Sequence, residues 1–468
     1  MKKKSILFVL FGLVLGLSVA YAAELINSKE VSFSNGATNL KANNVQDAIE
    51  EIYNKTIDNS SCKNVSAPKL GSGLIPVTIE NDGTVKYADT SKKWYNYCDK
   101  IWANAVILED GASYNVGDTI SEADIQSYFV WIPKYKYKLW NTGTASEGIH
   151  EIEIVFDETD TTDIEGVSCK TPMISGQSGN CNNGEYMTHP AFISMNTNGF
   201  WVGKFETGYK GATSAAAAQV NANDTSKVII KPNVYSWRGI TVKNMFETSY
   251  NYKRDLDSHM MKNTEWGAVA FLSHSKYGTN KEINLNNNSS YKTGFSSSPT
   301  ASQLTIPGDS GDGNNFNTTY NTAIGYKAST TENISGVYDM SGGSHEYMSS
   351  YLNGKTGVSG FTASTLSNYD SKYFDVYSSS SKESTFQYRI LGDATAEMGP
   401  FKNYADGNNA AVYHSTWYND SSGFIESDYP WFNRGGDFTY GVTAGIFDFR
   451  RFTGGAATYL SFRIVLTS

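Results

Sequence analysis

A histidine beside a carboxylate is suited to acid–base chemistry, and such a pair occurs at His345-Glu346. A histidine can accept and return a proton near neutral pH, and a neighbouring carboxylate can assist it. The chain has 6 histidines, but no motif joins them, and no G-x-S-x-G motif supplies a serine nucleophile. A Ser/His/Asp site assembled through space stays open. We interpret the histidines as structural or surface residues, so no catalytic residue is predicted.

The cysteines indicate disulfide bonds rather than a metal site. Cys62, Cys98, Cys169 and Cys181 are even in number and widely spaced, with no C-x-x-C spacing and no adjacent histidine pair. Of the three connectivities, Cys62–Cys98 with Cys169–Cys181 is the most economical. The second pair would close a loop rich in Gly, Ser and Asn.

Residues 1–22 have the form of an export signal. Three lysines precede an apolar run over 6–19, and small residues precede Ala23. We therefore expect a secreted or cell-surface protein, with an uncleaved membrane anchor as the alternative, because a spanning helix needs about 20 apolar residues. Removing 1–22 takes away three lysines and no acid, so the formal charge changes from -9 to -12 (-9 - 3). Such an acidic protein is not expected to bind nucleic acid.

Residues 431–463 form a weakly charged stretch that is rich in Tyr, Phe, Thr and Gly. Its paired glycines, Gly435-Gly436, permit a sharp turn or a close approach of strands. In the whole chain, 13% of residues are aromatic, and Tyr with Ser, Gly and Asn is the composition of binding loops. We interpret this stretch as a recognition surface. The alternative is a terminal hairpin whose rings close the core.

Several strands and one helix must carry these residues. An Asp82-Gly83 turn between apolar runs predicts a hairpin over 75–87, and Pro76 favours an edge position for its first strand. Apolar spacing also predicts a helix over 257–271. Further strands are predicted over 102–108, 128–133, 135–140 and 200–207.

The N-terminal part has a separate pattern. Residues 30–33 predict a strand, and Asn44 is suited to cap a short helix with apolar positions at Val45, Ala48, Ile49 and Ile52. A helix this short is marginal alone in water. A self-associating stalk over 44–56, and hence a homo-oligomer, is therefore the hypothesis for this part.

Three stretches, in order, resemble one family. Residues 263–270 resemble its Thr-Glu-x-x-Trp helix, 336–342 its Gly-x-Tyr-Asp-Met-x-Gly segment, and 434–463 its Arg-Gly-Gly to Phe-Arg end. Together they resemble the formylglycine-generating-enzyme type of C-type lectin fold, over about 126–467. The family's oxidase cysteines lie near the C-terminal strands, whereas the last cysteine here is Cys181. The resemblance therefore implies the scaffold and not the oxidase chemistry.

The same C-terminal stretch resembles the variable region of target proteins of diversity-generating retroelements. These proteins display a hypervariable ligand-binding face on the lectin scaffold, and their adenine-directed changes exclude Lys, Glu, Gln, Met and Trp. None of these five occurs in 437–468. The resemblance implies contact residues Trp431, Asp437, Phe438, Thr439, Tyr440, Val442, Thr443, Asp448, Arg450, Arg451, Phe452, Thr453, Thr458, Tyr459 and Leu460, with Gly435, Gly436, Ala444, Gly445, Phe462 and Arg463 as scaffold.

We therefore expect an α+β, C-type lectin-like domain with long loops, preceded by a small strand-helix module. The segments are 1–22 (signal), 23–60 (strand-helix module), 61–125 (disulfide-stapled linker and hairpin) and 126–468 (lectin-like domain). The expected function is non-enzymatic binding of a surface protein or glycan. A divergent enzyme or a structural surface or virion module is the alternative. No cofactor is predicted; calcium is the alternative at 417–420, which resembles the W-N-D motif of sugar-binding lectins with one tyrosine inserted.

Overall fold

The computed structural model describes residues 32, 44–49, 64–139, 149, 151–157, 184–297, 318–378, 390–395, 402–403, 414–415 and 417–467. The chain divides into two units, Met1–Lys63 and Asn64–Ser468. In the first unit residues 45–49 are helical, and the Asp47 amide donates to Asn44 Oδ1 at 2.8 Å. This confirms the predicted cap. The predicted signal at 1–22 lies outside the described residues. In the described part, no helix is both long and apolar enough to cross a membrane.

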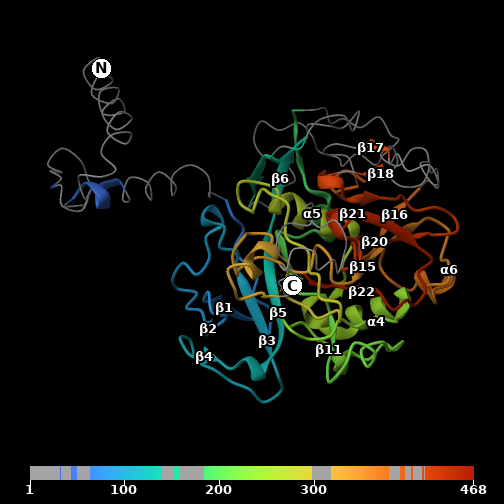
Figure 1. Cartoon of the computed structure of the whole chain (residues 1–468), viewed down its shortest axis with the longest axis horizontal. Helices are drawn as coiled ribbons and strands as arrows, with labels where there is room; N and C mark the ends of the chain where they lie inside the picture. The colour runs from blue at the N-terminus through green and yellow to red at the C-terminus, as the bar shows by residue number, and fades with distance from the viewer. Residues whose placement is uncertain are drawn as a thin grey trace, which may run out of the picture. The chain divides into compact units, whose positions relative to one another are not determined.

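The second unit contains a sheet with the strand order β12-β23-β9-β5-β3-β1-β2-β4. It lies on one side of the unit in Figure 1. The strands predicted over 75–87, 102–108 and 128–133 are confirmed in this sheet, and β5 is buried along nearly its whole length. The strand predicted over 200–207 ends at Gly203, and the one predicted over 135–140 is found as β6 (Tyr135–Lys138) in a separate three-stranded sheet. Of the strand predicted over 30–33, only Ser32 lies within the described residues. The strands are β1 (Ile75–Ile79), β2 (Val85–Tyr87), β3 (Asn104–Leu108), β4 (Thr119–Ile120), β5 (Ile125–Pro133), β9 (Gly199–Gly203), β12 (His259–Met260) and β23 (Ile464–Leu466).

This sheet continues across the boundary that the sequence placed at 125/126. Strand β3 pairs with β5 from Asn104 opposite Val130 to Leu108 opposite Ile125. The hairpin region and the following segment therefore share one sheet. The predicted edge position of β1 is wrong, because β1 pairs with both β2 and β3. Pro76 is tolerated there because β2 ends at Tyr87, so the missing N–H falls just beyond the β1–β2 ladder.

A second sheet has the order β16-β15-β20-β21-β19-β18-β17, with β22 paired to β15. It occupies the other side of the unit in Figure 1. It contains the C-terminal stretch singled out in the sequence. The strands are β15 (His345–Leu352), β16 (Asp375–Tyr377), β17 (Lys402–Asn403), β18 (His414–Ser415), β19 (Ser421–Ser422), β20 (Trp431–Gly435), β21 (Gly445–Phe452) and β22 (Leu460–Phe462).

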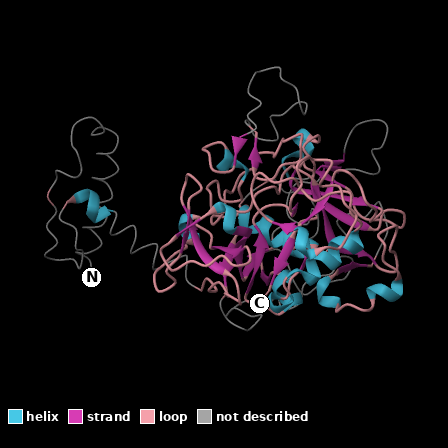
Figure 2. Cartoon of the chain, turned by 90° about the horizontal axis from the view of Figure 1, so that it is seen from below, coloured by secondary structure: helices cyan, strands magenta, loops and turns pink. Residues whose placement is uncertain are grey.

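Few helices accompany these strands among the described residues (Figure 2). Helix α5 (Asn263–Ser273) is buried throughout. Its predicted start at 257 is wrong, because Asp257 takes a left-handed φ of 48° and His259 enters β12. The helix begins where Glu265 Oε2 accepts the Lys262 amide at 2.9 Å.

The remaining short elements are β6 (Tyr135–Lys138), β7 (Ile154–Phe156), β8 (Tyr186–Thr188), β10 (Gly208–Tyr209), β11 (Val228–Ile229), β13 (Phe295–Ser296), β14 (Thr318–Thr319), α3 (Pro190–Met195), α4 (Val242–Tyr252) and α6 (Ala363–Leu366). The described part is mostly strand and loop, which agrees with the coarse α+β class. The formylglycine-generating-enzyme-like assignment stays a prediction.

Candidate ligand-binding face

The C-terminal stretch forms a hairpin of β20 and β21 whose connection returns sharply over 436–444. Gly435 and Gly436 have φ values of 84° and 70°, a region that side chains disfavour. A Cβ on Gly436 would lie 2.5 Å from the Ala444 Cβ. The glycine pair is therefore needed both for the backbone conformation and for the close approach of the two ends of the connection.

A buried arginine fixes the base of this hairpin. Arg434 Nη1 donates to the Asp393 carbonyl and Nη2 to the Ala394 carbonyl, each at 3.0 Å. From α5, the Trp266 indole donates to the Ile446 carbonyl at 2.7 Å. Both strands of the hairpin are thus held by side chains in the interior.

A second buried arginine fixes the end of the stretch. Arg463 Nε donates to Glu346 Oε2 at 2.9 Å, and its Nη1 and Nη2 donate to the Gly203 and Tyr338 carbonyls at 2.7 and 3.0 Å. Burial raises the pKa of Glu346, and the Arg463 guanidinium opposes that shift. This ion pair joins β15 to the start of β23.

Between these anchors, half-buried rings and a guanidinium form a continuous cluster. Arg450 lies 3.8 Å from the centroid of the Tyr440 ring, and its Nε contacts Asp448 Oδ2 at 2.9 Å. The His345 ring meets Tyr440 edge-on at 4.8 Å. Tyr459 follows, 6.1 Å from His345. We call Tyr440, Arg450, Phe452 and Tyr459 the aromatic face.

Residues from distant segments extend this face. Tyr291 packs edge-on against Phe438 at 4.9 Å, and Arg238 lies 3.8 Å from the Tyr291 centroid. Arg238 Nη1 also donates to the Thr458 carbonyl. Sequence reasoning missed Arg238 and Tyr291, because no local motif marks either residue and the chain separates each from 437–460 by more than a hundred positions.

Buried polar groups lie on the same side of the sheet as the aromatic face. Asn433 pairs with Arg450 and with Tyr347 across the strands, so alternation also brings His345 and Asp448 to that side. Among the described residues, no group lies within hydrogen-bonding distance of His345 Nδ1, Asn433 Oδ1 or Asp448 Oδ1. We call these three residues the polar floor.

The polar floor carries a defined charge. Burial raises the pKa of Asp448 to about 6, against the attraction of Arg450. Burial and the nearby Arg450 hold the pKa of His345 well below its ordinary value. At neutral pH the floor therefore offers one carboxylate, one amide and one neutral imidazole.

The structure divides the predicted contact residues into two groups. Trp431, Asp437, Asp448, Arg451 and Leu460 are buried, so their side chains support the face instead of forming its surface. The reason is packing: Trp431, for example, lies 5.0 Å from the Tyr351 ring, and Arg451 Nη1 donates to the Phe424 carbonyl at 2.9 Å. The half-buried or exposed group is Phe438, Thr439, Tyr440, Val442, Thr443, Arg450, Phe452, Thr453, Thr458 and Tyr459.

The other site predictions concern cysteines and metals. Cys98 is disulfide-bonded, whereas Cys62, Cys169 and Cys181 lie outside the described residues, so the two pairings stay predictions. Within the described ranges, no three His, Cys, Asp or Glu side chains are grouped to hold a metal ion.

Comparison with known proteins identifies no family for this chain. No protein-family model matches the chain, and no curated protein matches it. Among solved structures, the chain is similar to one titled "Major Tropism Determinant P3c Variant", at 11% identity, over 87% of this chain and 97% of that chain, with a TM-score of 0.25. A TM-score this low carries no argument about function.

Proposed function

We propose that this protein is an exported, non-enzymatic ligand-binding protein that presents the aromatic face to a protein or glycan on another surface. The proposal rests on a difference in burial between the residues of one short segment. Its anchors, Arg434, Gly436 and Arg463, are buried, while the rings between them stay half-buried. Buried anchors with adaptable residues between them are what a recognition surface requires.

The chemistry of the face suits recognition. Tyrosine and arginine are enriched among residues that dominate binding energy, because they bring large contact areas at low entropic cost. Arg450 is already fixed by Asp448 and by the Tyr440 ring, so little of its freedom is lost on binding. The buried polar floor places a carboxylate beneath these rings, which holds Arg450 in position. No cofactor is needed for this role.

Diversification of the face is part of the proposal. It is supported by the absence of Lys, Glu, Gln, Met and Trp from 437–468 and by the half-exposed positions within that range. The test is the DNA around the gene. A near-repeat of the sequence encoding 437–468, differing only at adenines and adjacent to a reverse transcriptase gene, is expected. If no such repeat is found, the protein is better described as an adhesin whose binding face is not diversified.

Binding itself is tested with a triple variant, Tyr440→Ala/Phe452→Ala/Tyr459→Ala. Labelled native protein is applied to immobilised glycans and to cells, and we expect the variant to lose the binding that the native protein shows. A matched control replaces Tyr95 and Tyr429, which lie outside the face, with alanine and retains binding. Equal binding by the triple variant would refute the assignment of the face.

A further inference from the structure

A cavity of about 770 Å³ within the second unit is lined by none of the residues of the aromatic face. Its wall is made by the segment 67–69, by β5, by the end of α3 with the following loop, and by Thr467 near the chain end. Its volume falls within the range of about 300–1,000 Å³ that is typical of small-molecule sites. None of the sequence predictions assigned a role to this region.

Two tryptophans hold the segment on one side of the cavity. The Trp131 indole donates to the Ser66 carbonyl at 3.0 Å, and the Trp201 indole donates to the Lys69 carbonyl at 2.7 Å. The Lys134 amide donates to Ser66 Oγ at 3.1 Å. Although this segment has no regular secondary structure, its backbone is fixed to β5 and β9, so the rim that carries Lys69 is preformed.

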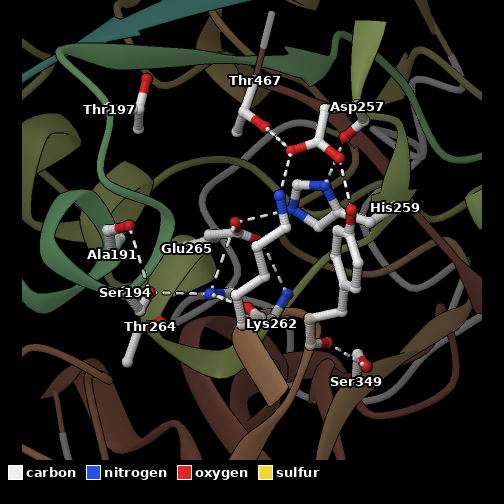
Figure 3. A network of polar contacts seen from close by, with 12 residues as sticks. Ala191, Ser194, Thr197, Asp257, His259, Lys262, Thr264, Glu265, Ser349 and Thr467 are labelled. Carbon is white, nitrogen blue, oxygen red and sulfur yellow. Dashed lines mark hydrogen bonds and ion pairs between the residues drawn. The ribbon is translucent and has the colours of Figure 1, made fainter. Parts of the chain in front are cut away.

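A polar network holds the opposite side (Figure 3). Thr467 Oγ1 donates to Asp257 Oδ2 at 2.9 Å, and Lys372 Nζ contacts the same oxygen at 2.8 Å. In the same network, Lys262 Nζ donates to Ser194 Oγ on α3 at 2.7 Å. These contacts tie both Thr467 and α3 to the interior, so this wall is also preformed.

The loop after α3 supplies the polar groups of the third side. Asn196 ends the helix with a left-handed φ of 48° and has an exposed side chain. The Lys134 amide donates to the Asn198 carbonyl at 2.9 Å, which places the loop over β5. Amide and hydroxyl groups from this loop therefore line the cavity beside the apolar Ile193 and Phe192.

The charge of the lining indicates the class of ligand. Lys69 and Lys134 are the charged side chains among the described residues that line the cavity. Lys134 is buried and pairs with the buried Asp157, whose Oδ2 lies 3.9 Å from its Nζ, so Lys69, which is exposed, is the cation that a ligand can reach. The chain as a whole has a formal charge of -9. An exposed lysine beside the amide and hydroxyl groups of the lining, in such an acidic chain, favours an anion that also carries hydroxyl groups.

We propose that this cavity binds a small hydroxylated acid, with the bulk of one or two sugar rings and one carboxylate or phosphate. Lys69 attracts the anion. The Asn and Thr side chains bond the hydroxyl groups, while Ile193 and Phe192 contact the C–H surface of the ligand. This site is separate from the aromatic face and does not depend on the function proposed for it.

The experiment is calorimetric titration of the full chain with glucuronate, glucose 6-phosphate and glucose. We expect binding of at least one acid, with glucose much weaker, and weaker acid binding as salt rises. Ile193→Trp places a large ring on the apolar wall of the cavity and weakens acid binding at least about tenfold. Lys69→Ala, at an exposed position, weakens acid binding about fivefold, whereas Lys355→Ala, at an exposed lysine outside the cavity, has no effect.

The two acids distinguish the two anions. Binding of glucuronate alone identifies a carboxylate ligand, and binding of glucose 6-phosphate alone identifies a phosphate ligand. Thermal unfolding shows that each variant is folded before it is titrated. Failure of all three probes to bind, equal binding of glucose and the acids, or unchanged acid binding by the folded Ile193→Trp protein would overturn the proposal.

Discussion

The aromatic face and the cavity differ in how the chain builds them. Most of the face comes from one segment, 437–460, whose half-buried side chains lie between buried anchors. The cavity takes its lining from segments spread between residues 67 and 467, each held by hydrogen bonds to the interior. Changes in the face therefore alter few supporting contacts, whereas changes at the hydrogen-bonded positions of the cavity wall, such as Trp131 or Thr467, disturb the fold. If both proposals hold, the aromatic face is suited to a variable ligand and the cavity to a fixed one.

The largest effect is expected at the anchor of the face. Arg463→Met leaves Glu346 buried without its partner, and removing one member of a buried ion pair costs about 3–5 kcal/mol. The free energy of unfolding in urea measures this loss. The double variant Arg463→Met/Glu346→Met should recover more than half of the loss. A single variant within about 1 kcal/mol of the native protein would show that Arg463 is not an anchor.

The next effect concerns the glycine turn at the start of the face. Gly436→Ala combines a left-handed φ with a contact of 2.5 Å to Ala444, so we expect a loss of roughly 2–4 kcal/mol. Gly73→Ala is the matched control. Its φ is 82° and the added Cβ meets nothing within 4 Å, so the loss there should be about 1 kcal/mol. Equal losses would remove the packing argument, and Ala444→Gly should rescue Gly436→Ala in part.

A smaller effect is expected at the cavity wall. The Lys372, Tyr373 and Thr467 side chains, opposing the effect of burial, lower the pKa of Asp257 from 3.8 to about 2. A folded pKa below the unfolded value stabilises the fold above pH 3.8, and this stability is lost as the pH falls towards 2. Asp257→Asn should therefore lose about 2 kcal/mol at pH 7.

Unfolding measured from pH 7 to pH 2 tests this expectation. The difference between native protein and Asp257→Asn should shrink between pH 4 and pH 2, in the window of the two pKa values. Asp255→Asn, at an exposed carboxylate two residues away, is the control and should follow the native curve. A difference that stays constant with pH would mean that Asp257 acts through packing and not through its charge.

The smallest effect is expected within the face. Thr458 has an exposed side chain, and Arg238 contacts its carbonyl and not its hydroxyl. Thr458→Lys should therefore change the free energy of unfolding by less than about 0.5 kcal/mol. Thermal and urea unfolding measure it. A loss of more than about 2 kcal/mol would contradict the tolerance that we infer for the face.

Local chemistry made part of the fold predictable from sequence. The Asp82-Gly83 turn identified the β1–β2 hairpin, and Gly435-Gly436 identified the turn after β20, because each depends on backbone conformations available to these residues. The edge position of β1 was mispredicted, since a proline shows that one N–H is missing but not where the neighbouring strand ends.

The candidate sites were less predictable, because they depend on contacts between distant residues. Arg238 and Thr458 are 220 positions apart, and nothing near either residue in the sequence indicates that they meet. Burial of Trp431 and Asp448 followed from packing across the second sheet. The cavity had no sequence signal at all, since its lysines, threonines and asparagines are common surface residues when taken singly.

Strand β23 has a consequence for synthesis of the protein. It pairs with β9 on one side and with β12 on the other, so residues 464–466 complete a sheet whose other strands are made earlier in synthesis. A chain that stops within 437–460 lacks β23 and leaves two strand edges unpaired, which exposes it to aggregation and proteolysis. The fold thus couples completion of this sheet to synthesis of the whole segment 437–460.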